Sequence, residues 1–348
     1  MPDKTALKVS RQEAEIFLRA LFEQAGVETP AAASVAAGLV EADLQGVHSH
    51  GMLQAPNYLR RLRAGTIAKG STLKPVHQSA AISVFDAGLI LGHPGAEQAM
   101  TAATDSARQF GIAAVAVRAA THFGVAGRYV RSAADAGLIG IAMCNTRPML
   151  PAPGGDQAVV GNNPLSIAVP CAGRAPIVFD MAMSAASMGK VRLAAQRGEP
   201  IPLGWAVDET GTPTTDAQAA IKGMLLPAAG AKGFGLALMV DFLCALSGGS
   251  AGSEVATTYG PADRPADCSW FFIAIDPAHF GLDRAYTDHI AELAGHIADR
   301  SPLPGDGKLA AAKAAADMVT VQHTLAAELE ALSLEMGGAS RLQPVPAP

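Results

Sequence analysis

An imidazole flanked by small residues follows the second predicted helix of the chain. The segment Ser49-His50-Gly51 comes shortly after Gly46, which ends an apolar helical run, so we expect a tight turn. A histidine presented on such a turn can donate or accept a proton, because its ordinary pKa of about 6.5 suits both roles near neutral pH. His50 is therefore the first candidate for a general acid or base.

Four glycine-rich segments stand at predicted junctions or in loops, at 122–127, 161–164, 232–235 and 304–307. Glycine lets the backbone approach a ligand closely, and free amides at a helix start favour phosphate. Lys232 at the head of its helix opposes the helix dipole unless an anion is bound there. The pattern indicates a phosphorylated cofactor, although no G-x-G-x-x-G follows a strand and glycines also serve simply as turns.

Two other chemistries are open to the same turn. His48 and His50 could share a metal ion in a strand, but no third ligand stands at a recognisable spacing. Ser49 could be a hydrolase nucleophile, but adjacent side chains generally diverge and no acid partner is placed. We therefore predict no metal site and keep a serine hydrolase as an alternative.

Composition narrows the class of protein. The 348 residues are 49% hydrophobic with a net charge of −5 and no basic block, which argues against nucleic-acid binding. No uncharged stretch reaches the roughly 20 residues of a membrane span, and no apolar stretch follows the charged N-terminus as in a signal peptide. The four cysteines lack metal-type spacing. We predict a cytoplasmic protein with a small-molecule partner and no nucleic acid or membrane.

Hydrophobic periodicity predicts alternating helices and strands after a helical start. The Ser10/Glu13 capping box opens the first helix. Further helices are expected at 29–44, around 58–62, at 96–109, 126–137, 184–198 and 232–246, and in the C-terminal part. In the helix at 232–246 we expect the Phe, Leu and Met side chains to be core. Strands are expected at 81–86, 112–117, 138–145, 165–169, 177–179 and 270–275, with a loop at 148–163 and an irregular segment at 248–267.

Nine short motifs stand in an order that resembles the type 2 malate/L-lactate dehydrogenase family, from about residue 10 to about residue 335. They are Ser49-His50-Gly51 with Tyr58, His122-Phe123-Gly124, Asn145-Thr146, Pro153-x-Gly155, Gly161-x-Asn163-Pro164, Asp180-Met181-Ala182-x-Ser184, Gly189-Lys190, Gly204-Trp205-Ala206-x-Asp208 and Lys232-Gly233-x-Gly235. Each motif is weak alone, but their shared order is specific.

The resemblance implies a homodimeric oxidoreductase that uses NAD(H) or NADP(H) on small 2-oxo acids, their hydroxy acids or cyclic imino acids. Its fold would be mixed α/β and non-Rossmann, with a largely antiparallel central sheet and helical N- and C-terminal parts. By similarity His50 is the proton donor, Ser49 orients it, and His122 joins the catalytic group. The cofactor would contact His122, Phe123, Gly124, Asn145, Thr146, Asp180, Met181, Ala182, Ser184, Lys232, Gly233, Pro304, Gly305 and Asp306.

Three parts are expected along the chain. Residues 1–75 form a helical part that carries the Ser-His-Gly motif and packs with 310–340. Residues 76–125 with 285–309 form a domain on the substrate and cofactor side. Residues 126–284 form the nucleotide-binding domain.

Departures from the family pattern concern the substrate. Gln54 stands where the family usually has an arginine, and a neutral amide cannot replace a charge-assisted pair with a carboxylate. Asn162 replaces a threonine, Ser269-Trp270 replaces Gly-His, and Lys190 stands where some relatives carry an aspartate that orients the histidine. Arg147 is a candidate substitute guanidinium. The predicted substrate side is thus Gln54, Tyr58, Asn162 and Arg147; the alternative is a nucleotide-binding family member with an altered or lost substrate pocket and no turnover.

Overall fold

A mixed seven-stranded sheet forms the centre of the computed structural model, which describes residues 6–282 and 284–345. Along the sheet the strands are β2 (Lys74–Ser79), β3 (Ile82–Asp86), β4 (Ile112–Ala120), β13 (Cys268–Ile275), β5 (Ile139–Cys144), β8 (Leu165–Val169) and β9 (Ile177–Met181). β3 and β4 run parallel, and the other neighbouring pairs of this sheet run antiparallel. The expected mixed α/β fold with a largely antiparallel sheet is confirmed.

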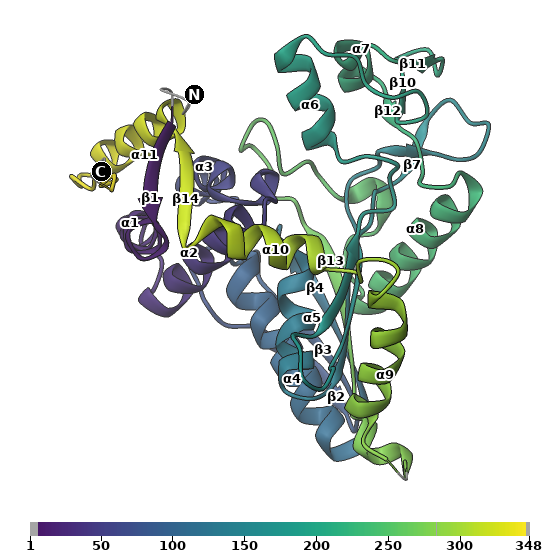
Figure 1. Cartoon of the computed structure of the whole chain (residues 1–348). Coiled ribbons are helices and arrows are strands. Elements are labelled where there is room, and N and C mark those ends of the chain that lie inside the picture. Colours follow the sequence, from purple (N-terminus) through teal and green to yellow (C-terminus); the bar gives the residue numbers. More distant parts are fainter. Residues whose placement is uncertain (1–5, 283, 346–348) are drawn as a thin grey trace.

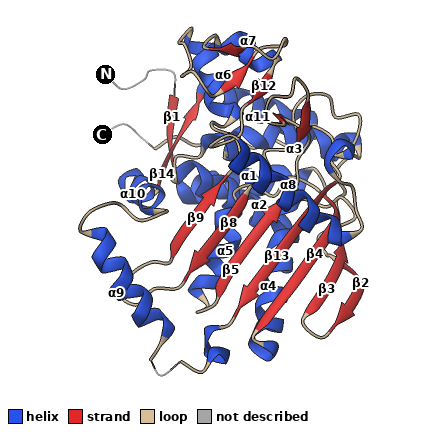
Figure 2. Ribbon diagram, turned by 90° about the vertical axis from the view of Figure 1, so that its right-hand side faces the viewer, coloured by secondary structure: helices blue, strands red, loops and turns tan. Residues whose placement is uncertain are grey.

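Helices cover both faces of this sheet (Figure 2). α4 (Gly92–Phe110) and α5 (Ala126–Asp135) pack on one face, and α8 (Ala231–Cys244) packs on the other. The central strand β13 is apolar except at Ser269, because both its faces are buried. Its side chains alternate accordingly: Trp270 and Phe272 join the α4 and α5 side, and Phe271 joins the α8 side.

A separate helical layer lies beside the sheet (Figure 1). It contains α1 (Arg11–Gln24), α2 (Thr29–Leu44), α3 (Ala55–Ala64) and α11 (His323–Glu335), with the ribbon of β1 (Ala6–Ser10) and β14 (Met318–Gln322). α9 (Tyr286–Ala298) and α10 (Asp306–Ala315) lead back from the sheet to this layer. Ser10 Oγ accepts a hydrogen bond from Glu13 N at 3.2 Å, so the predicted N-cap is confirmed.

The expected helical N- and C-terminal parts each contain one strand as well, which the sequence analysis did not predict. β1 comes before the first helix and pairs antiparallel with β14, near the other end of the sequence. A strand whose partner is so distant leaves no local pattern to read. The expectations for residues 1–4 and for the last three residues of the C-terminal tail lie outside the described residues.

The smallest lobe stands above the sheet (Figure 1). It contains β6 (Leu150–Pro151), β7 (Ala158–Val160), α6 (Met188–Arg197), β10 (Ala206–Val207), β11 (Pro213–Thr214), α7 (Ala217–Lys222) and β12 (Met224–Leu225). The helix expected from residue 184 begins at Met188 instead, because Ser187 is its N-cap and accepts from Lys190 N at 3.3 Å. The segment expected as a loop also pairs briefly, as β6 with β7.

The apolar helix α8 corrects another expectation, that its large side chains are core. Leu236, Met239, Phe242 and Leu246, the last just beyond the helix, are 48%, 49%, 59% and 62% exposed. The buried stripe of α8 consists mostly of small residues: Gly233, Ala237, Val240, Asp241 and Cys244. The apolar content of a helix alone does not distinguish a face that packs in the core from an apolar face that stays exposed.

Three large hydrophobic cores support these parts, one under the N-terminal helices and one on each face of the sheet, and a small fourth cluster packs α9 near β9. The sheet runs without interruption across the boundary proposed at residues 125 and 126, since β4 and β5 both pair with β13. The division into three domains stays a prediction. Over the described ranges, no helix combines the length and apolarity that crossing a membrane requires.

Candidate active site

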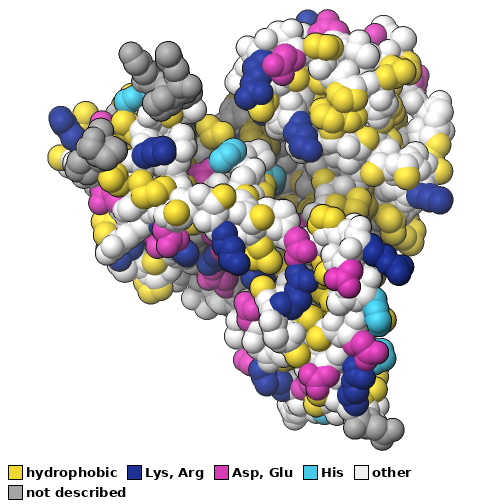
Figure 3. Space-filling view, viewed as in Figure 1, with side chains coloured by type: hydrophobic (Ala, Val, Ile, Leu, Met, Phe, Trp, Pro, Cys, Tyr) yellow, Lys and Arg dark blue, Asp and Glu magenta, His cyan; other side chains and the backbone are white. Residues whose placement is uncertain are grey.

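A cavity of about 350 Å³ lies among the N-terminal layer, the sheet and the smallest lobe. Figure 3 shows the molecular surface hollowed between the N-terminal layer and that lobe. The predicted site residues that line it are Ser49, His50, His122, Phe123, Gly124, Asn145, Thr146, Arg147, Asn162, Asp180, Met181 and Ala182. Segments far apart in the sequence therefore meet at one cavity, as expected of a functional site.

The turn that carries His50 is held by a carboxylate from α2. Asp43 accepts hydrogen bonds from Met52 N and from His48 Nδ1, each at 2.8 Å. The bond to Asp43 raises the pKa of His48, whose side chain is exposed. A Cβ on Gly51 would lie 2.3 Å from this carboxylate, so the glycine of the motif leaves the space that Asp43 occupies.

His50 contacts two polar neighbours at the cavity wall. Ser49 Oγ lies 2.9 Å from His50 Nδ1, and the His122 ring centroid lies 5.2 Å from that of His50. The expectation that the Ser49 and His50 side chains diverge is wrong, because the short hydroxyl reaches the ring nitrogen nearest the backbone. Ser49 thus contacts His50 in the way an orienting partner would.

Tyr58 fixes the orientation of His122 from behind the cavity. The Tyr58 hydroxyl lies 2.5 Å from His122 Nδ1, and Tyr58 is only 2% exposed. Burial raises the pKa of Tyr58 well above its ordinary value and lowers the pKa of His122 well below its own. The hydroxyl therefore keeps its proton and donates to a neutral imidazole, which leaves His122 Nε2 carrying the hydrogen.

His50 lies in a field set by one carboxylate and one amine. Burial lowers its pKa below the ordinary value, the charge of Asp180 opposes this shift, and the charge of Lys308 adds to it. Lys308 Nζ pairs with Asp180 Oδ2 at 2.6 Å, and both residues line the cavity. The expectation of an ordinary pKa for His50 is wrong, and the neutral imidazole is favoured near pH 7.

Gly124 is required twice over at the start of α5. Its φ is +76°, and a Cβ there would lie 2.5 Å from His93 Nε2. His93 is 1% exposed, and burial lowers its pKa to about 3. Val125, the N-cap of α5, has no side-chain cap, and Gly124, Val125 and Ala126 line the cavity. Free amides at this helix start could therefore bind an anionic group.

Three amides build the wall between β5 and α8. Asn145 is fully buried; its Nδ2 donates to Ser250 O at 2.9 Å, and its Oδ1 accepts from Ser269 N at 2.7 Å. Asn163 Oδ1 accepts from Thr146 N at 2.8 Å. Asn162, which lines the cavity, accepts from Thr146 Oγ1 at 3.0 Å. The asparagines of these motifs therefore make structural hydrogen bonds, and Asn145 and Asn162 also line the cavity.

A strap of residues 255–264 closes the outer side of the cavity and is held by one face of α3 and the turn before it. Gln54 Nε2 donates to Tyr259 Oη at 3.0 Å, and Asn57 Nδ2 donates to Thr258 O at 2.7 Å. Arg61, only 3% exposed, donates to the carbonyls of Arg264, Thr257 and Pro261 at 2.9, 3.1 and 3.2 Å. The irregular segment expected here is therefore tied down at several points.

Several predicted site residues lie outside the cavity wall: Gln54, Tyr58, Ser184, Lys232, Gly233, Pro304, Gly305 and Asp306. Gln54 and Tyr58 support residues that do line it. Lys232 is exposed at the start of α8, and Asp306 pairs with Arg174 at 2.5 Å.

Sequence reasoning missed Lys308, Arg192 and Tyr259, which line the cavity. Arg192 stands three residues after the Gly189 of a recognised motif, which is one turn along a helix, so helical spacing was an available signal. Tyr259 stands in the irregular segment and offered no such signal.

The described residues were also compared with the requirements of a metal site and of a reactive thiol. No group of three or more His, Cys, Asp or Glu side chains there is arranged to hold a metal ion. The four cysteines are buried and unpaired. Cys144 and Cys268 line the cavity, and burial raises the pKa of Cys144 well above its ordinary value, which keeps it in the unreactive thiol form.

Comparisons with known proteins agree with this architecture. Residues 9–330 match the family model described as malate/L-lactate dehydrogenase. The chain is 34% identical to a (2R)-3-sulfolactate dehydrogenase (NADP(+)) of Chromohalobacter salexigens, over 94% of this chain and 98% of that relative. It is 34% identical to a ureidoglycolate dehydrogenase (NAD(+)) of Escherichia coli O157:H7, over 86% of this chain and 85% of that relative.

A solved structure agrees as closely. The sulfolactate dehydrogenase from Methanocaldococcus jannaschii superposes with a TM-score of 0.90 at 31% identity, over 95% of this chain and 98% of that one. The fold and these matches define a dehydrogenase of the NAD(P)-dependent class. Within that class, the chain belongs to the malate/L-lactate dehydrogenase family.

Proposed function

We propose that the chain uses NAD(H) or NADP(H) to interconvert a small 2-oxo acid and its 2-hydroxy acid, or to reduce a cyclic imino acid, with His50 as the acid/base. The observation that carries this proposal is the position of His50. It lines the cavity between Ser49 and His122, and burial favours its neutral form. An imidazole so placed can accept the proton of a substrate hydroxyl.

The residues present fit a dinucleotide. The uncapped start of α5 at Val125 and Ala126 offers backbone amides for phosphate, and Asp180 and Lys308 supply a carboxylate and an amine. When bound, the nicotinamide supplies or accepts the hydride. Lys232 is exposed and Gly233 is buried, and neither lines this cavity. They could bind the cofactor only through a part of it that extends outside the cavity.

The contact with Ser49 is compatible with the tautomer of His50 that the reaction needs. When Nδ1 carries the hydrogen, it donates to Ser49 Oγ, and Nε2 is left free to accept a proton from the substrate. In the reductive direction the protonated ring donates from Nε2 and stabilises the negative charge that develops on the substrate oxygen. His122, held by Tyr58 with its Nε2 hydrogen free, is a second donor toward the same substrate.

Purified protein tests the proposal in two stages. NADH and NADPH binding is followed by nucleotide fluorescence, and turnover by nucleotide absorbance with a panel of 2-oxo, 2-hydroxy and cyclic imino acids. We expect binding of at least one nucleotide and turnover that falls about 100-fold or more in His50→Gln. Binding without turnover anywhere in the panel would support the nucleotide-binding alternative instead, and labelling of Ser49 by an acylating reagent would support the hydrolase.

We also propose a cytoplasmic homodimer in which α8 packs against a second copy. Leu236, Met239, Phe242 and Leu246 present an apolar surface that the rest of this chain leaves exposed. A second copy is favoured as the partner because homodimers are the commonest symmetric assemblies. Light scattering should give twice the monomer mass, and Phe242→Glu with Leu246→Glu should give the monomer; a monomeric native protein would overturn this assignment.

A further inference from the structure

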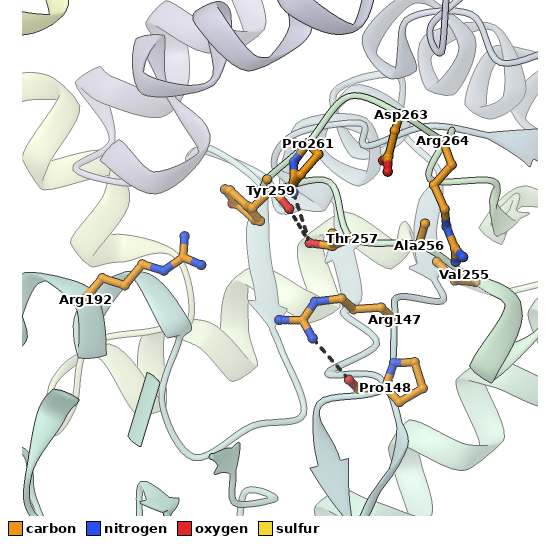
Figure 4. Close-up of a pocket in the computed structure, with 11 residues that line it drawn as sticks. Arg147, Pro148, Arg192, Val255, Ala256, Thr257, Tyr259, Pro261, Asp263 and Arg264 are labelled. Atoms are coloured by element: carbon orange, nitrogen blue, oxygen red, sulfur yellow. Dashed lines mark hydrogen bonds between the residues drawn. The ribbon is translucent and has the colours of Figure 1, made fainter. Parts of the chain in front are cut away.

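Two guanidinium groups face one another at the outer end of the cavity (Figure 4). Arg147 follows β5, and Arg192 stands on α6. Both line the inner cavity and also an adjoining outer cavity of about 830 Å³, and the close-up shows their side chains extending toward each other beneath Tyr259. Two positive charges from different elements therefore converge on one space.

Neither guanidinium has a carboxylate partner among the described residues. Arg147 Nη1 donates a long hydrogen bond of 3.5 Å to the neighbouring Pro148 carbonyl. Arg192 lies over the Tyr259 ring, with Cζ 5.1 Å from the ring centroid. Burial, and then the charge of Arg192, lower the pKa of Arg147. Like charges held together in this way favour binding of an anion between them.

The outer cavity as a whole is also cationic. Arg264 adds a third guanidinium to its wall, and Asp263 is its one carboxylate among the described lining residues. The charge of Asp263 acts on Arg61, which holds the strap, and so it is not reserved for Arg147 or Arg192. The described lining residues of the outer cavity therefore carry a net positive charge, which favours an anionic ligand.

The glutamine at position 54 bears on the role of the Arg147 and Arg192 guanidinium groups. Gln54 Nε2 binds Ser49 O at 2.6 Å and Tyr259 Oη at 3.0 Å, so position 54 supports the strap and contributes no cation. The Tyr259 ring whose hydroxyl Gln54 binds is the ring that Arg192 contacts. Arg147 and Arg192 are therefore the cavity-lining cations of a chain that lacks the arginine expected from the family resemblance at position 54.

The guanidinium pair lies within reach of His50. A Cβ on Gly189 would lie 3.0 Å from Ser49 Cβ, and Arg192 follows one helical turn later, about 5 Å along α6. A substrate whose C2 is beside His50 could therefore extend an acidic group two or three bonds away to Arg192.

We propose that Arg147 and Arg192 form an anion subsite that selects 2-oxo or 2-hydroxy acids with a second acidic group, such as a carboxylate or sulfonate. This inference rests on the proposed function, since it names the substrate class of the same site. The other source of an oxyanion is the 2′-phosphate of NADP(H). The substrate is favoured because Arg192 lies close to the Ser49 and His50 turn.

The first test measures binding without turnover. Isothermal titration of the whole chain compares succinate, a dianion with no ketone, with propionate, its monoanionic counterpart. We expect succinate to bind about tenfold or more tightly than propionate, with the preference lost in Arg192→Gln and Arg147→Gln and partly kept in Arg192→Lys. Arg197→Gln, on the same helix but outside both cavities, is the matched control. Equal binding of both acids, or a preference unchanged in both Gln variants, overturns the subsite.

The second test separates this inference from the proposed function. With oxaloacetate and pyruvate as 2-oxo acids, Arg192→Gln should raise KM for oxaloacetate about tenfold and change KM for pyruvate much less. A preference for succinate without reduction of any acid would overturn the proposed function and leave the subsite standing. Reduction without that preference would do the reverse. A rise in KM confined to NADPH would assign the pair to the cofactor and overturn the substrate assignment.

Discussion

The side-chain amide of Gln54 joins the Ser49 backbone to the Tyr259 hydroxyl, at 2.6 and 3.0 Å. This contact couples the turn that carries His50 to the strap over the cavity. Gln54 is 3% exposed, so both of its hydrogen bonds are shielded from solvent. The amide therefore has a positioning role that neither residue pattern nor family resemblance indicated.

Removing that amide should loosen the strap. Gln54→Leu leaves the Ser49 carbonyl and Tyr259 hydroxyl without their shared donor, which should cost about 1 to 2 kcal/mol in the free energy of unfolding. Urea denaturation measures the loss. Tyr259→Phe removes one of the two bonds and should cost less; an equal or larger loss in Tyr259→Phe would contradict the assigned role of Gln54.

Arg61 should matter more for stability than any exposed arginine of α3. Arg61→Met leaves three strap carbonyls unpaired and should cost about 3 kcal/mol, because a buried charge-assisted network is lost. Arg60→Met, which breaks an exposed pair with Glu328, is the matched control and should cost under about 1 kcal/mol. Similar unfolding midpoints for the two variants would refute the strap's dependence on Arg61.

The pH dependence of turnover should report the lowered pKa of His50. In the oxidative direction His50 must be neutral, so kcat/KM should be level at neutral pH and fall only as pH drops below about 6.5. Reduction needs the protonated ring and should slow as pH rises. An oxidative inflection clearly above that value would contradict a buried, neutral imidazole.

The ion pair beside His50 supplies a sharper version of that test. Lys308→Met removes a charge that lowers the pKa of His50, so the inflection should move up. Asp180→Asn removes a charge that raises it, so the inflection should move down. Shifts in the same direction for both variants would show that Asp180 and Lys308 do not act on His50 by charge.

Gly124 should tolerate alanine worse than another glycine of similar backbone conformation. Gly124→Ala meets both a φ of +76° and a Cβ position 2.5 Å from His93, which should cost about 3 kcal/mol. Gly137→Ala meets a φ of +89° with nothing within 4 Å and should cost about 1 kcal/mol. Thermal unfolding of both variants isolates the clash with His93, and equal losses would mean that the imidazole simply moves aside.

Local patterns predicted the elements well and their partners poorly. The apolar run of the buried strand β13 and the Ser10 cap are both short local patterns of the sequence, and both are found in the structure. The pairing of β1 with β14 depends on residues at opposite ends of the chain. The exposed side of α8 was predicted to be core, because an apolar sequence does not indicate whether the same chain or another molecule covers the helix.

The site was predicted in the same uneven way. The order of the motifs in the sequence placed His50, His122, Asn145 and Asp180 in one predicted site, and all four line one cavity. The Arg192 and Tyr259 contact joins a helix to an irregular segment, and no spacing rule links such positions. Short-range motifs and the family resemblance therefore indicated the His50 side of the cavity and Arg147, whereas Arg192 and Tyr259 were found only in the tertiary structure.

The shared core of the two chain ends has a consequence for synthesis. Leu18, Leu39 and Leu59 of the N-terminal helices pack in the same core as Leu325 and Leu329 of α11. During translation the first helices emerge early, but their apolar faces stay uncovered until α11 leaves the ribosome. The core of these N-terminal helices is therefore incomplete until residues 323–335 have been made, so chaperones that shield exposed apolar segments can act on it while the residues in between are synthesised.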